Sequence, residues 1–414
     1  MKKQKFPLYL QILLALILGV LFGIFLPEKV EYVSWMGEIF MRALKMIIIP
    51  LILTSIISGV ANIGGTDNLG RLGLRTIGYY MLTSLLAIVT GLFFVNIFKP
   101  GVGFDLKSTE PIQDIAVSDN PFMDTLMNIV PTNIFQAFNE SNMLSIIFFA
   151  LLFGFFITTI RKDYSKLLVD FFNASFEAMM KLTQFIIKFT PFGIFGIIAK
   201  VVSEQDNLGE LAGRLGIYML VVLAGLFFHA FITLPTLVRT IGRVNPIKHF
   251  RLMVSTLLTA FSTSSSGATL SLTMDTVKNK VGVSNKIASF TLPLGATINM
   301  DGTALYELVV AMFIAQAYGI ELTITQQFIA VFTALLASIG AAGIPMAGLV
   351  MISVILSTLG LPLEGLGLVI AVDRILDMFR TAVNVWSDSC AAVIIAKKEG
   401  ETLLIENEKT LNKV

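Results

Sequence analysis

The sequence DRILDMFRTAVN, residues 373–384, follows directly on the apolar run of residues 366–372. On a helix, which turns about 100° per residue, an arc of roughly 100° holds Asp373, Asp377, Arg380, Thr381, Asn384 and Asp388. The opposite face is apolar and can meet lipid or packed protein. Charged side chains are rare at membrane depth, where they mark functional sites. The stripe therefore predicts a binding site on one face of a long helix.

The composition is that of a membrane protein. Of 414 residues, 55% are hydrophobic and 14% are charged, whereas soluble domains carry about 25% charged residues. Several apolar runs reach the roughly 20 residues that cross a bilayer. A membrane barrel would instead show short alternating segments. We therefore expect an all-α polytopic protein whose surface meets lipid.

Three classes of function find little support in the sequence. The net charge is +2 and the basic residues are spread over loops, so we expect no nucleic-acid partner. Cys390 is the only cysteine, so a disulfide framework is excluded. We expect this cysteine to lie in the core. The two histidines, His229 and His249, are far apart and are not predicted to be catalytic.

The distribution of lysine and arginine predicts the topology, because these residues collect on cytoplasmic loops. Lysines at 2, 3 and 5 precede the apolar run 8–26, which lacks a small-residue cleavage site and is expected to be a retained first helix. Basic loops then alternate with acidic ones through residue 251, which six spans explain. We expect both termini to be cytoplasmic and the protein to lie in the plasma or inner membrane.

This alternation fails at two segments, residues 252–274 and 324–356. Lysines follow the first as well as precede it, and glutamates flank the second on both sides. Each segment also contains a small-residue break, Ser264–Gly267 in the first and Gly340–Pro345 in the second. We therefore predict two re-entrant hairpins of opposite orientation, which is the inverted-repeat pattern of secondary transporters. The alternative is that one or both segments cross fully.

The sequence NMDGT, residues 299–303, interrupts the apolar helix expected over 287–317. Gly302 lies among side chains that offer oxygens, which predicts local unwinding toward a cavity. Oxygen ligands without thiols or imidazoles suit a hard cation, and broken transporter helices use unwound carbonyls in this way. The alternative is a kinked packing contact.

Three further groups suggest what the cavity binds. Arg380 has a planar fork that suits a carboxylate, and Asp377 would hold an ammonium group; the alternative is that the two satisfy each other as i, i+3 neighbours. Asp388 has no cation on its own face, which leaves a metal ion or a proton. Glu307 is either a proton-exchanging carboxyl group or a permanently protonated structural one.

With these residues in place, the chain resembles the dicarboxylate/amino-acid:cation symporter family, the glutamate transporters. The resemblance covers essentially the whole chain. Its most specific parts are the sequences at 264–267, 299–303, 343–345 and 377–384, and the third-helix sequence YMLTS at 80–84 also matches. Within the family, it resembles the animal excitatory amino-acid transporters and the archaeal aspartate transporters.

The resemblance implies the glutamate-transporter fold, with eight transmembrane helices and two re-entrant hairpins in a homotrimer. Its scaffold would comprise residues 1–70 (helices 1 and 2) and 127–204 (helices 4 and 5), separated by helix 3 at 71–99 and an extracellular loop at 100–126. The transport domain, moving like an elevator, would be completed by residues 205–398: helix 6, hairpin 1 at about 250–280, helix 7 at about 285–318, hairpin 2 at about 322–360 and helix 8 at about 364–397. Residues 399–414 would be a cytoplasmic tail.

The resemblance also implies site residues. Substrate would be bound by Ser264, Ser265, Thr303, Gly343, Asp377, Arg380, Thr381 and Asn384. Sodium ligands would be Gly295, Asn299, Asn384 and Asp388 at a first site. A second site, largely of backbone groups, would use Thr297, Ser338, Ile339 and Ala341. A third would use Tyr80, Thr83, Ser84, Asn299 and Asp301.

Single positions indicate the subfamily. Neutral amino-acid relatives lack the arginine at 380, relatives for C4-dicarboxylates lack the aspartate at 377, and proton-coupled bacterial relatives tend to have asparagine at 388. Glu307 matches the proton-carrying glutamate of the animal transporters, so proton and potassium coupling are hypotheses. A second arginine is usual near the site, but this chain has Thr263 and Met378 at those positions; whether Arg374 replaces it is open.

The sequence thus predicts a sodium-driven symporter for glutamate or aspartate, and not an enzyme. A carrier of neutral amino acids or C4-dicarboxylates on the same scaffold is the nearest alternative. Two other classes are an intramembrane enzyme with Asp301 and Asp377 as a carboxylate dyad, and an anion channel.

Overall fold

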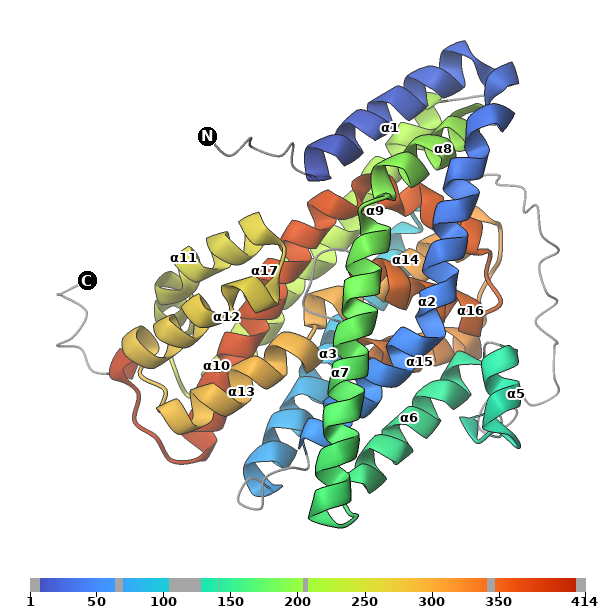
Figure 1. The fold of residues 1–414 in the computed structure, drawn as a ribbon. Helices are drawn as coiled ribbons and strands as arrows, with labels where there is room; N and C mark the ends of the chain where they lie inside the picture. Colours follow the sequence, from blue (N-terminus) through green and yellow to red (C-terminus); the bar gives the residue numbers. More distant parts are fainter. Residues whose placement is uncertain are drawn as a thin grey trace, which may run out of the picture.

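The computed structural model describes residues 8–63, 70–103, 127, 129–140, 142–203, 208–340 and 347–406. Within these ranges the chain is helical throughout and contains no strand (Figure 1). The first half contains α1 (Leu8–Phe25), η1 (Pro27–Lys29), α2 (Glu31–Ile63), α3 (Gly70–Phe98), α5 (Ile134–Asn139), α6 (Met143–Ile157), α7 (Lys162–Ile187) and α8 (Thr190–Ser203). These helices confirm the all-α prediction for the part of the chain that they cover.

The second half is built in the same way. It contains α9 (Leu208–Phe228), η2 (His229–Thr233), α10 (Leu234–Thr240), α11 (Pro246–Thr263), α12 (Ser266–Asp275), η3 (Thr276–Val281), α13 (Asn285–Ile298), α14 (Asp301–Ala317), α15 (Ile324–Gly340), α16 (Ala347–Thr358), η4 (Leu363–Gly365), α17 (Leu366–Lys398) and η5 (Leu404–Glu406). The segments η2 and η3 are π-helical, so their backbone is wider than that of the helices that they continue.

Four helical segments within the described residues are long and apolar enough to cross a membrane. They are Glu31–Ala61 in α2, Leu72–Phe98 in α3, Ala212–Thr240, which joins α9, η2 and α10, and Asn285–Ala317, which joins α13 and α14. A fifth span results if α7 and α8, which are bent by 51° at their junction, are counted together. The chain is therefore a multi-pass membrane protein, and the eight spans remain a prediction.

Helix α1 and the beginning of α2 both pack against α8 at the upper end of the molecule (Figure 1). Their contact is close because glycines lie where the helices cross. A Cβ atom at Gly196 would lie 2.7 Å from the carbonyl oxygen of Val33 and 2.8 Å from the amide nitrogen of Gly37. Small residues permit such an approach of two backbones in membrane helices.

The two predicted hairpin segments each form a pair of helices that pack against each other, α11 with α12 and α15 with α16. In the first pair, Ser264 adopts the left-handed conformation (φ 49°) and ends α11, after which Ser265 caps α12 by accepting a hydrogen bond from the Ala268 amide. The predicted break at the serine run is thus confirmed. In the second pair, residues 341–346 lie outside the described residues.

The predicted interruption of the seventh helix is also confirmed. Helix α13 ends at Ile298 and α14 begins at Asp301, with Asn299 (φ −95°, ψ 76°) and Met300 (φ −110°, ψ 58°) in non-helical conformations between them. Helix α14 is buried along its whole length except at Gln316, and it contacts α3, α9, α15, α16 and α17. It therefore forms the centre of the second half.

Helix α17 presents its polar stripe to this centre. All six side chains of the stripe are buried, and on the apolar side Ile375 is half exposed while Trp386 and Cys390 are buried. Past the end of α17, the side chains of Leu403 and Ile405 are buried and Lys397 pairs with Glu406 at 2.9 Å. The beginning of the predicted tail therefore packs onto the protein.

We predict that Gly196→Ala destabilises the protein, because the added methyl group meets two backbone atoms that cannot move aside. Overpacking of this kind costs about 1–3 kcal/mol, so the thermal midpoint of the purified protein should fall. The control is Gly216→Ala in α9, where an added Cβ meets nothing within 4 Å and alanine is the better helix former. Equal midpoints for the two variants would contradict the packing argument.

Candidate functional site

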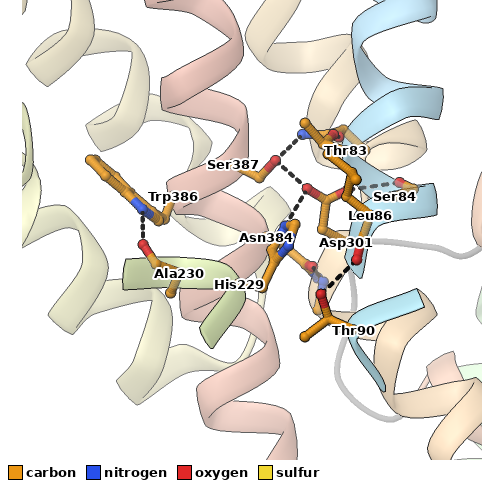
Figure 2. Close-up of polar contacts among 12 residues, drawn as sticks. Thr83, Ser84, Leu86, Thr90, His229, Ala230, Asp301, Asn384, Trp386 and Ser387 are labelled. Atoms are coloured by element: carbon orange, nitrogen blue, oxygen red, sulfur yellow. Dashed lines mark hydrogen bonds and ion pairs between the residues drawn. The ribbon is translucent and has the colours of Figure 1, made fainter. Parts of the chain in front are cut away.

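Asp301 is the centre of a buried polar network drawn from four helices. Its carboxylate accepts hydrogen bonds from Ser84 of α3 at 2.7 Å and from Ser387 of α17 at 2.6 Å, and it lies 3.1 Å from Nε2 of His229 in η2 (Figure 2). All four side chains are buried. These hydrogen bonds compensate a carboxylate that has been removed from water.

Asn299 lies in the unwound segment beside this carboxylate. Its Oδ1 accepts a hydrogen bond from the Thr83 hydroxyl at 3.2 Å. Its Nδ2 donates to the Ser387 hydroxyl at 3.0 Å and to Oδ1 of Asp388 at 2.9 Å. The amide therefore connects α3, the unwound segment and α17.

Asp388 approaches the backbone of α13 at Gly295. A Cβ atom at this position would overlap the Asp388 carboxylate and would lie 3.0 Å from the Tyr80 hydroxyl oxygen. Tyr80 itself donates to the carbonyl oxygen of Thr291 at 2.7 Å. Glycine at 295 is therefore what allows the carboxylate and the phenol to come this close to the helix.

The start of α14 is held to α17 by Asn384. The amide N–H of Gly302 donates to Oδ1 of Asn384 at 2.8 Å, and Nδ2 of Asn384 donates to the Thr303 hydroxyl at 3.0 Å. Both ends of this side-chain amide are used, which fixes its orientation and brings Thr303 onto the polar stripe.

The donor set of this network fits a hard monovalent or divalent cation. Carboxylates, amide and hydroxyl oxygens, and the carbonyls freed by the break after α13 are the ligands that such ions prefer. Within the described ranges, no group of three or more His, Cys, Asp and Glu side chains could hold a metal ion. The candidate cation ligands are therefore mainly neutral oxygens around one or two carboxylates.

Arg380 is buried between two carboxylates of its own helix. Its Nη2 lies 2.9 Å from Oδ1 of Asp373 and 2.9 Å from Oδ1 of Asp377, and its guanidinium carbon is 3.8 Å from the centre of the Tyr306 ring. The i, i+3 pairing that the sequence left open is therefore present. Arg374, at 3.6 Å from Oδ2 of Asp377, adds a second guanidinium to the same carboxylate.

Part of the Arg380 fork remains available. Among the described residues, Nε and Nη1 have no hydrogen-bond partner. Nη1 points toward α16, since a Cβ atom at Gly348 of that helix would lie 2.9 Å from it. A small anionic group could therefore be bound between α17 and α16.

Glu307 lies one turn after Thr303 on α14 and is fully buried. Neither of its carboxyl oxygens has a hydrogen-bond partner in the described part of the chain. An ionised carboxylate without partners would be very costly here. The geometry therefore requires a proton or another ligand at this group.

Several predicted site residues do not join the network. Ser264 is buried without a hydrogen-bond partner for its hydroxyl among the described residues, Thr297 is exposed and donates to Leu294 O, and the Ser338 hydroxyl donates to Leu335 O within α15. Thr381 is buried on the stripe. Ala341 and Gly343 lie outside the described residues, and only the helical backbone of Ile339 is described.

Two residues of the network were missed by the sequence analysis. Ser387 lies at the margin of the α17 stripe, so helical spacing could have included it. His229 carries no such signal, because its contact with Asp301 spans 72 residues and depends on how η2 packs beside α3. A third residue, Asp373, was placed on the stripe but not among the ligands.

Comparison with known proteins agrees with the resemblance drawn from the motifs. Residues 8–398 match the model of the sodium:dicarboxylate symporter family. The proton/sodium-glutamate symport protein of Geobacillus stearothermophilus is 38% identical over 408 residues, 96% of each chain.

Two further relatives come from distant organisms. Excitatory amino acid transporter 3 of Mus musculus is 37% identical over 462 residues, covering 97% of this chain and 88% of the relative. The proton/glutamate-aspartate symporter of Escherichia coli K12 is 36% identical over 421 residues, covering 96% and 94%. Because the family model and these identities extend over almost the whole chain, the protein belongs to the sodium:dicarboxylate symporter family.

Proposed function

We propose that the protein is a sodium-coupled symporter for the acidic amino acids glutamate and aspartate. The observation that carries the proposal is the proximity of two different buried sites on α17. One is the guanidinium of Arg380, two of whose nitrogens have no partner within the described residues, and the other is the oxygen network around Asp301 and Asp388. Its relatives that are named as glutamate symporters, and the one named as an excitatory amino acid transporter, support the same function.

Sodium coupling is inferred from the charges of the oxygen network around Asp301 and Asp388. Neither Asp301 nor Asp388 pairs with a lysine or arginine among the described residues, although both are buried. A bound cation would neutralise them and replace the missing water. Cation-loaded protein could then move through the membrane, whereas a half-loaded form with an uncompensated charge would be disfavoured.

The preference for acidic substrates is inferred from the Arg380 site. The unused Nε and Nη1 of Arg380 would bind the side-chain carboxylate of the substrate, and Asp377 would bind its ammonium group. In the structure, both acidic partners of Arg380 are on its own helix. We infer that the substrate carboxylate takes over part of this compensation, which frees Asp377 for the ammonium group.

The site assignments made from the resemblance are carried forward as proposals. The contacts of Asn299, Asp388, Gly295 and Asn384 support the first sodium site, and those of Thr83, Ser84 and Asp301 support the third. The second sodium site rests on the resemblance alone, since the described contacts of Thr297 and Ser338 stay within their own helices.

We further propose that the two helix pairs are re-entrant hairpins and that α3 and residues 205–398 move as an elevator within the plasma or inner membrane. In support, α15 and α16 contact α2 and α6 of the proposed scaffold, so a domain boundary would run between them. A second support is that α11 and α12 contact α17, and that α15 and α16 contact α14, the two helices that carry most of the polar network.

The proposed homotrimer is supported by the exposed surface of α7. Asp170, Glu177 and Lys181 are exposed and lie on one face of this helix. Charged side chains at membrane depth face protein or water rather than lipid. A second copy of the chain would cover this face.

The carboxylate-dyad enzyme loses its basis in this geometry. A dyad requires two carboxylates close enough to share a proton. Here Asp301 is bonded to Ser84, Ser387 and His229, while Asp377 is paired with Arg380 and Arg374.

Uptake into proteoliposomes tests the proposed function. Labelled aspartate and glutamate should accumulate with sodium outside and not with choline, whereas serine and succinate should accumulate in neither case. Accumulation of serine or succinate alone would replace the proposal by the neutral amino-acid or dicarboxylate alternative.

Arg380→Ala should lower acidic amino-acid uptake about a hundredfold or more, because a buried partner of the substrate carboxylate is lost. Any transport of serine should persist. The matched control is Arg239→Ala, an exposed arginine of α10, which should transport like the unaltered protein. Undiminished glutamate uptake by Arg380→Ala would contradict the assigned role.

Glu307→Gln tests proton coupling through the buried carboxyl group. If Glu307 carries a proton, uptake by the unaltered protein should rise when the outside is more acidic than the inside, and the variant should not respond. Glu321→Gln, at an exposed position, is the control and should respond normally. Flux through the unaltered protein that ignores both the pH gradient and internal potassium would remove proton and potassium coupling.

A further inference from the structure

Ser387 is hydrogen-bonded to two residues of the proposed third sodium site, Asp301 and Asn299. Its hydroxyl oxygen lies 2.6 Å from Oδ2 of Asp301 and 3.0 Å from Nδ2 of Asn299, and the side chain is fully buried. A hydroxyl group has one proton to donate. The carboxylate oxygens of Asp301 can only accept, so Ser387 donates its proton to Asp301 (Figure 2). The hydroxyl oxygen then accepts the hydrogen bond from Asn299.

This arrangement determines which way the Asn299 amide faces. Its nitrogen has two acceptors, Ser387 and Asp388, while its oxygen receives the Thr83 hydroxyl. The amide oxygen is thereby turned toward α3, where Ser84 also meets Asp301. A hard cation at this place needs that oxygen and is repelled by the N–H groups on the other side of the amide.

We propose that Ser387 is a positioning residue for sodium, which holds the Asn299 amide with its oxygen toward the Asp301 cation site. The inference rests on the proposed sodium coupling. Loss of the hydroxyl removes an acceptor from the Asn299 nitrogen and a donor from the Asp301 carboxylate. Both losses weaken the observed orientation, which Asp388 and Thr83 then hold without help, against a rotated amide whose N–H groups meet Asp301 in the place where the cation needs an oxygen.

The test is a sodium titration of thermal stability on the purified full-length protein without amino acid, with choline chloride keeping the ionic strength constant. In Ser387→Ala the half-saturating sodium concentration should rise about tenfold, the equivalent of one lost hydrogen bond to a charged group. Glutamate affinity at saturating sodium should remain near that of the unaltered protein. Ser387→Thr retains the hydroxyl and should restore the sodium response.

The matched control is Ser389→Ala, two residues further along α17. Ser389 is equally buried, and its hydroxyl lies 2.6 Å from Nε2 of His249. This variant should keep the sodium response of the unaltered protein, which separates the effect of Ser387 from that of any lost buried hydroxyl. An equal shift in both alanine variants would overturn the inference.

Other outcomes also decide the matter. If Ser387→Ala binds sodium as tightly as the unaltered protein, or more tightly because Asp301 has lost a competing donor, the inference is wrong. Should this variant lack a cooperative transition, Ser387→Cys, whose thiol is a weak donor and acceptor, replaces it with the same expected direction. An unaltered protein that sodium does not stabilise would instead refute the sodium coupling itself, and the inference with it.

Discussion

Buried charge is the constraint on which this structure depends. Arg380, Asp373 and Asp377 compensate one another, whereas Asp301 relies on two hydroxyl donors and a histidine. Burial without such partners would cost more than the fold could supply. The helices around α17 are therefore arranged so that their polar side chains meet one another. The break between α13 and α14, at Asn299 and Met300, lies beside them.

Much of this arrangement was predictable because its signals are local. The buried stripe of α17 follows from helical periodicity, and the break before α14 follows from Gly302 among oxygen-bearing side chains. The turn at Ser264 was indicated by the serine run and by the charges that flank the segment. The resemblance then grouped Thr83, Ser84, Asn299 and Asp301, and in the structure Thr83 bonds Asn299 while Ser84 bonds Asp301.

The remainder depends on packing that no local pattern records. The contact between His229 and Asp301 joins residues 72 positions apart and arises where the π-helical turn η2 lies beside α3. The sequence analysis paired Arg380 with Asp377, three residues earlier, but it did not show that the same nitrogen also bonds Asp373, seven residues earlier.

The two proposed sites are connected by Asn384. It lies about one turn after Arg380 and one turn before Asp388, so it faces both sites from α17. Both ends of its amide are bonded to the first turn of α14, at Gly302 and Thr303. That turn also carries Asp301. A cation that draws Asp301 or Asn299 toward itself therefore acts on the same backbone that presents Thr303 to a substrate. Coupling between ions and amino acid then needs only a shift in this shared turn, since each ligand would favour the same arrangement of α14 against α17.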